Sequence, residues 1–139
     1  MTDGPRPMTN NAQRQLPTRF GFLLVNDFTL ISMSSAVETL RMANRLARQE
    51  IYRWKSISTE GGALAASDGL SVVADCAIGD EASLEDADTI IVCVGRRVES
   101  NTTDAVIRWL KKASQSGLGL GSVCTGSYVL AKAGLLDGY

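Results

Sequence analysis

The chain has 139 residues, of which 45% are hydrophobic and 21% are charged, and its formal net charge is −1. This balance is typical of one globular domain with its own core. A chain so close to neutrality lacks the basic field that would attract a nucleic acid to this segment, and no apolar run approaches the ~20 residues that span a bilayer. The chain contains no histidine, so its own residues cannot form a Ser–His–Asp triad, a Cys–His dyad or a histidine metal site.

The first 18 residues are polar and contain all three prolines of the chain. We expect them to form a disordered tail before a single domain over residues 19–139. The tail lacks the apolar stretch of a signal peptide, and the three cysteines form no Cys-x-x-Cys pair. These features predict a cytoplasmic protein in a reducing compartment, with no metal and no cofactor.

The first half of the chain begins with a nearly continuous apolar run over residues 20–25, which is typical of a strand buried in a parallel sheet. An apolar linker is expected at 28–33. The spacing of Ser35 and Glu38 then matches a capping box and predicts a helix over about 35–49. Further along, we expect a strand at 52–59 and a hairpin whose strands are 64–66 and 70–74, joined by Ser67-Asp68-Gly69.

The second half repeats the alternation of strand and helix. Its expected elements are a short acidic turn or helix at 83–87, a strand at 89–94, a helix over about 102–116 capped by Asn101 or Thr102, a strand at 118–123 and a helix over 125–133 that ends at Gly134. The fold class predicted by this order is α/β, an open parallel sheet with helices on both faces. Because such a sheet normally continues, we expect the chain to be truncated after Tyr139.

One segment has the pattern of a binding or catalytic site, the run Gly-Ser-Val-Cys-Thr-Gly-Ser at 121–127. It joins a predicted strand directly to a predicted helix, and small residues stand two positions before and two positions after Cys124. This pattern is typical of a nucleophile elbow, in which bulkier neighbours would clash. The elbow would place Cys124 at the carboxyl edge of the sheet, where open α/β folds bind ligands. The N–H groups of Thr125 and of Gly95 or Arg96 could converge there on an anion.

Three interpretations of Cys124 remain open: a small, buried structural cysteine, a ligand-pocket residue and a catalytic nucleophile. The sequence favours the ligand-pocket residue over the structural cysteine, and disfavours the nucleophile because no histidine can activate the thiol. Glu38 has two possible roles. It can serve the capping box and pair with Arg41, or it can face Cys124 as a carboxylate across a pocket. Cys76 and Cys93 are expected to be structural, since a cysteine inside a buried strand behaves as a small hydrophobe.

The stretches 28–45, 92–95 and 124–139 resemble AraC-type transcriptional regulators whose N-terminal half is a PfpI-like, class I glutamine amidotransferase-like domain. The resemblance covers residues 19–139 and implies a flavodoxin-like sheet that senses a small molecule. The subgroup that these stretches most resemble responds to amino acids and quaternary amines such as arginine, glycine betaine and carnitine. The resemblance also implies a homodimer. It further implies DNA binding through a C-terminal helix-turn-helix domain that this chain lacks.

Two positions depart from the enzymes of that family. Thr125 stands where catalytic members have a histidine, and Ser32 lies near the position of their acidic residue. The resemblance therefore implies a non-catalytic sensor, with Cys124, Thr125, Gly95, Arg96 and Glu38 as its ligand-binding residues. The alternative is a Cys-dependent hydrolase or deglycase in which Cys124 acts with Glu38.

Overall fold

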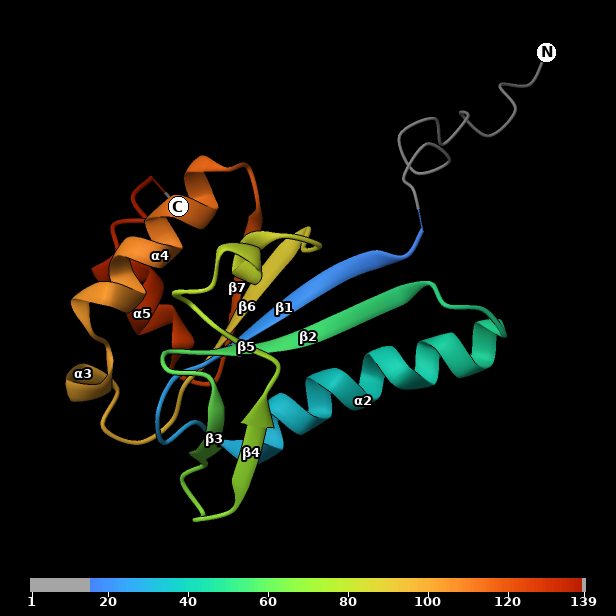
Figure 1. Ribbon diagram of the computed structural model, residues 1–139, viewed down its shortest axis with the longest axis horizontal. Helices are drawn as coiled ribbons and strands as arrows, with labels where there is room; N and C mark the ends of the chain where they lie inside the picture. Colours follow the sequence, from blue (N-terminus) through green and yellow to red (C-terminus); the bar gives the residue numbers. More distant parts are fainter. Residues whose placement is uncertain (1–15, 139) are drawn as a thin grey trace.

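The computed structural model describes residues 16–138 and shows a five-stranded sheet with helices packed against it and a separate hairpin (Figure 1). The sheet order is β5-β2-β1-β6-β7, and each neighbouring pair in it is parallel. Its strands are β1 (Thr18–Leu24), β2 (Tyr52–Ser58), β5 (Cys76–Ala77), β6 (Thr89–Cys93) and β7 (Gly119–Val123). The helical elements are α2 (Leu30–Ala47), the 3-10 turn η1 (Glu81–Leu84), α3 (Val98–Asn101), α4 (Asp104–Gln115) and α5 (Gly126–Lys132).

Alternate side chains of the strands point to opposite faces of the sheet, as the period of a strand requires. On one face, Leu23, Ile90 and Val92 form a core with the buried side chains of α4 and α5. On the other face, Phe22 and Leu24 pack with the apolar residues of α2. Figure 1 shows α2 on one side of the sheet and α4 and α5 on the other, so the predicted open α/β architecture with helices on both faces is confirmed.

The predicted tail falls largely on residues outside the described part of the chain. The described part differs from the prediction at one position, because β1 already begins at Thr18. The Thr18 N–H donates to the carbonyl of Ile51 at 2.9 Å, so the backbone of Thr18 is already tied to the residue before β2.

The predicted start of the first helix was wrong. Helix α2 begins at Leu30, with Thr29 as its N-cap, so Ser35 and Glu38 both lie inside the helix and form no capping box. The linker expected at 28–33 is therefore mostly the first turn of α2. The physical reason is burial, because Leu30 and Met33 already pack against the sheet together with later residues of the same face.

The expected cap of the second long helix was also displaced. Helix α4 is capped by Thr103, whose hydroxyl accepts a hydrogen bond from the N–H of Val106 at 3.3 Å. Asn101 instead ends the short helix α3, and Thr102 is buried. The separate turn of α3 shifts the cap of α4 one residue beyond the predicted position.

The hairpin confirms its prediction, with β3 (Gly62–Ala65) and β4 (Ser71–Ala74) paired antiparallel. In the turn, the Asp68 carboxylate accepts a hydrogen bond from the N–H of Leu70 at 2.9 Å. The hairpin is tied to the loop after β1, because the N–H of Ser67 donates to the carbonyl of Phe28 at 2.8 Å.

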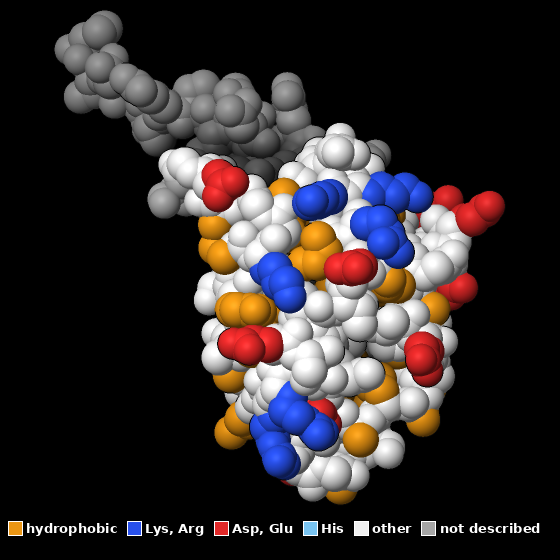
Figure 2. Space-filling model, turned by 90° about the vertical axis from the view of Figure 1, so that its left-hand side faces the viewer, with side chains coloured by type: hydrophobic (Ala, Val, Ile, Leu, Met, Phe, Trp, Pro, Cys, Tyr) orange, Lys and Arg blue, Asp and Glu red, His pale blue; other side chains and the backbone are white. Residues whose placement is uncertain are grey.

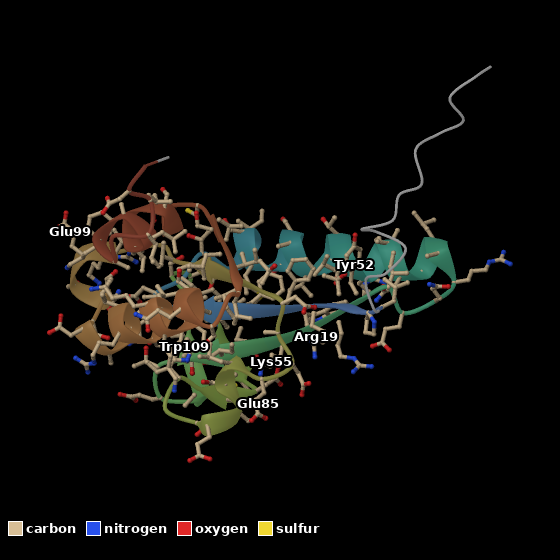
Figure 3. All side chains as sticks on the ribbon, turned by 90° about the horizontal axis from the view of Figure 1, so that it is seen from above. Arg19, Tyr52, Lys55, Glu85, Glu99 and Trp109 are labelled. Carbon is tan, nitrogen blue, oxygen red and sulfur yellow. The ribbon has the colours of Figure 1, made fainter. Side chains whose placement is uncertain are left out.

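The segment around η1 is fastened to two elements of the domain, in the region where Figure 3 labels Lys55, Glu85 and Trp109. The Lys55 ammonium donates to the carbonyls of Ala82 and Glu85 at 2.9 and 2.6 Å. From α4, the indole N–H of Trp109 donates to the hydroxyl of buried Ser83 at 3.0 Å. These contacts fix the connection between the hairpin and β6.

Acidic and basic side chains are interspersed on the face that Figure 2 presents. Such a mixed surface provides no field of a single sign. No helix within residues 16–138 is long and apolar enough to cross a membrane.

Candidate functional site at the carboxyl edge of the sheet

The predicted elbow joins β7 to α5 with Cys124 at its apex. Cys124 has a positive φ of 55°, a left-handed conformation that non-glycine residues adopt at a cost. The structure also shows why the residue two positions later is small. A Cβ on Gly126 would lie 2.6 Å from the carbonyl oxygen of Val92 and 2.8 Å from the Cβ of Ser122. The steric pattern predicted around Cys124 is therefore confirmed.

The Cys124 thiol is exposed and has hydroxyl groups for neighbours. The Thr29 hydroxyl lies 3.7 Å from its Sγ atom. This hydrogen bond is the largest cause that lowers the pKa of Cys124, with smaller contributions from the Thr125 N–H and from the side chains of Ser32 and Thr125. These groups stabilise the thiolate by hydrogen bonding, but a hydroxyl is not a general base at neutral pH.

Thr29 was not predicted as a site residue. It occupies the N-cap of α2, but its side chain makes no capping hydrogen bond, because the hydroxyl points to Cys124 instead. Ser32 was noted in the sequence only for its place in the family pattern, and the structure brings it to the thiol. No local pattern around Thr29 reveals this role, since its partner lies 95 positions later.

Gly95 lies two residues beyond the end of β6 and beside Thr29. A Cβ on Gly95 would stand 2.7 Å from the Thr29 hydroxyl and 2.5 Å from the carbonyl oxygen of Asp27. Only glycine leaves room for the loop after β1 to approach this closely. The structure thus brings Gly95 into the neighbourhood of Cys124 through Thr29.

Of the two N–H groups predicted to converge on an anion with that of Thr125, the Arg96 N–H donates to the carbonyl of Asp27 at 3.1 Å. The Arg96 guanidinium lies 3.5 Å from the carbonyl of Ser67 in the hairpin. Its side chain therefore connects the loop after β6 to the hairpin, and any contact with a ligand remains a prediction.

Glu38 pairs with Arg41 on the surface of α2, as predicted, although the capping box expected of the same residue is not formed. The carboxylate accepts from the guanidinium at 2.6 and 2.8 Å and is 57% exposed. The Arg41 hydrogen bond lowers the pKa of Glu38. Ser32, which contacts the thiol, lies on the same helix as Glu38. The backbone of Glu38 is ~9 Å further along the helix axis and on a different side of the helix. Its role as a ligand-binding carboxylate remains a prediction.

A second polar cluster, also missed in the sequence, lies beside the elbow. Asp27 follows β1 with φ 63°, and Arg97 follows β6 with φ 50°. The Arg97 guanidinium donates to Oδ2 of Asp27 at 2.7 and 3.1 Å, and the Asn101 amide donates to the same oxygen at 3.1 Å. Arg97 and then Asn101 lower the pKa of Asp27. Left-handed residues thus stand just after three neighbouring strands, at Asp27, Arg97 and Cys124.

A polar pocket of about 400 Å³ opens at the same edge of the sheet. It is lined by Asp27, Arg97 and Asn101 together with residues at the end of β2, in the loop that follows and in the hairpin, among them Ser58, Glu60 and Leu64. Cys124 is outside this lining. The pocket and the elbow therefore share an edge and meet at the loop after β1.

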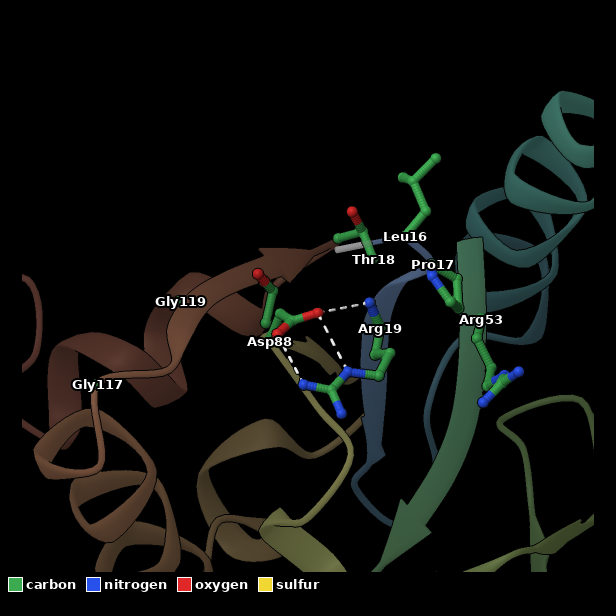
Figure 4. A pocket seen from close by; sticks show the side chains of 9 residues that line it. Leu16, Pro17, Thr18, Arg19, Arg53, Asp88, Gly117 and Gly119 are labelled. Atoms are coloured by element: carbon green, nitrogen blue, oxygen red, sulfur yellow. Dashed lines mark hydrogen bonds and ion pairs between the residues drawn. The ribbon is translucent and has the colours of Figure 1, made fainter. Parts of the chain in front are cut away.

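A larger pocket of about 690 Å³ lies at the opposite, amino edge of the sheet (Figure 4). Its cations are already paired, because Arg19 contacts Asp86 and Asp88 while Arg53 contacts Glu50. Ligands of open α/β sheets bind at the carboxyl edge. We therefore take the smaller pocket and the elbow as the candidate functional site.

The other two cysteines have no part in this site. Burial raises the pKa of Cys93 to about 12, and burial also raises the pKa of Cys76. Both shifts favour the inert thiol form.

An open parallel sheet with an elbow cysteine at its carboxyl edge defines a class of α/β domains whose site is built around a strand-to-helix turn. Within that class, residues 22–139 match the model of the DJ-1/PfpI family. The chain belongs to the DJ-1/PfpI family.

Among curated proteins, the chain is 45% identical over 127 residues to the HTH-type transcriptional regulator GbdR of Pseudomonas aeruginosa, covering 91% of this chain and 34% of GbdR. It is 42% identical over 120 residues to the HTH-type transcriptional regulator GlxA of Rhizobium meliloti, covering 86% of this chain and 36% of GlxA. The chain thus spans about a third of the length of these relatives.

Among solved structures, an AraC family transcriptional regulator from Pseudomonas putida superimposes with a TM-score of 0.78 at 30% identity, covering 88% of this chain and 64% of that one. The DJ-1 superfamily protein Atu0886 of Agrobacterium tumefaciens superimposes with a TM-score of 0.68 at 20% identity, covering 87% and 61%. The second likeness concerns the fold alone. The predicted kinship with PfpI-like domains of AraC-type regulators is confirmed.

Proposed function

We propose that this domain senses a small-molecule effector for a DNA-binding transcriptional regulator and does so without catalysis. The observation that carries the proposal is the environment of Cys124, where an enzyme-like elbow is kept but the neighbours of the thiol are hydroxyls and an N–H. Such groups bind a ligand by hydrogen bonding and do not move protons at neutral pH. The similarity to HTH-type regulators supports the same function.

The effector site in this proposal comprises Cys124, Thr125, Gly95 and Arg96, with Glu38 as a further ligand-binding residue. The family resemblance favours an amino acid or a quaternary amine as the effector. Binding would act on DNA through a helix-turn-helix domain beyond this segment and through a homodimer in the cytoplasm, by favouring one of two arrangements of the regulator.

Thermal unfolding of the chain with L-arginine, glycine betaine and L-carnitine tests the proposal. A ligand that binds only the folded state stabilises it by roughly 2.7 kcal/mol at a hundredfold excess over its Kd. We expect one of these compounds to raise the Tm, and the shift to shrink in Cys124→Ser but not in Cys76→Ser. Unchanged unfolding with all three compounds would exclude this class of effector.

A Cys-dependent hydrolase or deglycase is the second candidate, and the lowered pKa of Cys124 is the observation that favours it. It predicts turnover of an ester, amide or glyoxal adduct that Cys124→Ser abolishes. Equal rates for the wild-type chain and Cys124→Ser would exclude this activity.

A further inference from the structure

The loop after β1 is held on both sides before it reaches Thr29. On one side, Arg97 and Asn101 donate to a single carboxylate oxygen of Asp27, and the Arg96 N–H donates to the Asp27 carbonyl at 3.1 Å. On the other side, the hairpin contacts the carbonyl of Phe28. Two residues beyond Asp27, the Thr29 N–H donates to the carbonyl of Val94 at 3.3 Å. The path of this loop decides where the Thr29 hydroxyl lies.

Asp27 suits this position for two physical reasons. Its φ of 63° lies in the left-handed region, which aspartate and asparagine tolerate better than most residues. Its carboxylate is only 23% exposed and accepts hydrogen bonds from the Arg97 guanidinium and the Asn101 amide, so the loop is tied to both ends of α3 by charge-assisted hydrogen bonds. Removing the carboxylate would remove the side-chain anchor of the loop two residues before Thr29 and leave the loop held by its backbone hydrogen bonds alone.

From this geometry we infer that Asp27 is a positioning residue for Cys124, acting through the backbone of its own loop and the hydroxyl of Thr29. Asp27 also lines the polar pocket of about 400 Å³. A molecule that binds Asp27 or Arg97 there therefore changes the position of the Thr29 hydroxyl relative to the Cys124 thiol. The relevance of this coupling to sensing rests on the proposed function, whereas the coupling itself can be measured without an effector.

The direction in which the pKa of Cys124 changes when the Asp27 carboxylate is removed distinguishes a positioning role from a direct electrostatic effect. The groups that act on the thiol are Thr29, Ser32 and Thr125, none of which is charged. If Asp27 acted on Cys124 as a nearby anion, its removal would favour the thiolate and lower the pKa of Cys124. If it acts by holding Thr29 in place, its removal weakens a hydrogen bond to the thiolate and raises that pKa.

The experiment measures the rate of alkylation of Cys124 by iodoacetamide between pH 5 and pH 10 in the 139-residue chain, with site-resolved mass spectrometry. The variants are Asp27→Ala, Asp27→Asn, Thr29→Val and the double variant Asp27→Ala/Thr29→Val. Asp27→Asn keeps a hydrogen-bond acceptor and a side chain that tolerates positive φ. This variant therefore still measures the effect of Asp27 on the thiol if Asp27→Ala does not fold. Glu50→Gln is the matched control, since it removes an exposed carboxylate from an arginine pair remote from the elbow.

We expect the pH midpoint of alkylation to rise in Thr29→Val and in Asp27→Ala, and to rise less in Asp27→Asn. We expect a several-fold slower reaction at pH 7 in the first two variants and no change in Glu50→Gln. The double variant should match Thr29→Val, because both changes remove the same contact. A lower midpoint in the Asp27 variants, an unchanged midpoint, or additive effects in the double variant would each overturn the inference.

Discussion

The hydroxyl of Thr29 and the Sγ atom of Cys124 lie 3.7 Å apart and join the start of α2 to the elbow across 95 positions of the chain. The same threonine is the N-cap of α2, but its side chain forms no capping hydrogen bond with the helix. Its hydroxyl is thus directed to the thiol, where it is the largest cause of the lowered pKa of Cys124. The site is therefore polar and stabilises the thiolate by hydrogen bonding.

The three cysteines should differ sharply in their reaction with iodoacetamide. Because the pKa of Cys124 is lowered and that of Cys76 is raised, the alkylation of Cys124 should reach half of its maximal rate at the lower pH. Cys93, with a pKa of about 12, has roughly one thiolate in ten thousand at pH 8 and is also buried. Peptide mapping after timed alkylation should find Cys124 modified first and Cys93 modified only after unfolding. Equal rates at Cys124 and Cys76 would contradict the described environment of the elbow.

Gly126→Ala should destabilise the domain, because the added Cβ would stand 2.6 Å from the Val92 carbonyl and 2.8 Å from the Ser122 Cβ. Neither atom is at the end of a flexible side chain. We expect a loss of about 1–3 kcal/mol in the free energy of unfolding, as for other overpacked core positions. Chemical denaturation followed by circular dichroism measures the loss.

Gly79→Ala is the matched control for that substitution, since a Cβ at Gly79 meets no atom within 4 Å. Its effect should stay within about 0.5 kcal/mol. A Gly126→Ala protein as stable as Gly79→Ala would show that the elbow does not need a small residue two positions after Cys124.

Much of this fold could be predicted from sequence because its strands are buried. The apolar runs at 20–25 and 89–94 mark β1 and β6 to within two residues at either end, since a strand covered on both faces carries mainly apolar side chains. The elbow could be predicted because its steric requirement falls on neighbours only two positions away. Both signals are local, and the structure reproduces both.

The remaining features depend on contacts that no local pattern contains. The capping box at Ser35 and Glu38 was misleading because α2 starts where Leu30 and Met33 pack against the sheet. The N-cap Thr29 is held there by a hydrogen bond from its N–H to the carbonyl of Val94, just beyond β6. In the same way, Asp27 and Arg97 lie 70 positions apart, and only the parallel pairing of β1 with β6 brings them together.

Asn44 should be important for stability because it ties the end of α2 to β2. Its side-chain oxygen accepts from the N–H groups of Ile51 and Tyr52, and its amide donates to the Tyr52 carbonyl, all at 2.9 Å. Asn44→Ala removes these hydrogen bonds from the N–H and carbonyl of Tyr52, whereas the Ile51 N–H keeps the Gln49 carbonyl as an acceptor at 3.0 Å. We expect a loss of about 2–3 kcal/mol. Asn44→Asp keeps the acceptor for both N–H groups and should cost less. Equal losses in urea unfolding of the two variants would show that the acceptor is not what matters.

The ion pair between Asp27 and Arg97 should give the stability of the domain a dependence on acid pH. The pKa of Asp27 is lower in the folded chain than in the unfolded chain, first because of Arg97 and then because of Asn101. A lowered carboxylate pKa contributes stability that is fully present above the unfolded value of about 4 and is lost as the pH falls through the folded value. The Tm of the wild-type chain should therefore exceed that of Asp27→Asn at pH 7, and the difference should disappear in acid. Glu50→Gln, which breaks an exposed pair within one turn, should show a smaller difference. A Tm difference for Asp27→Asn that persists unchanged below about pH 3 would show that the charge of Asp27 is not the source of its contribution.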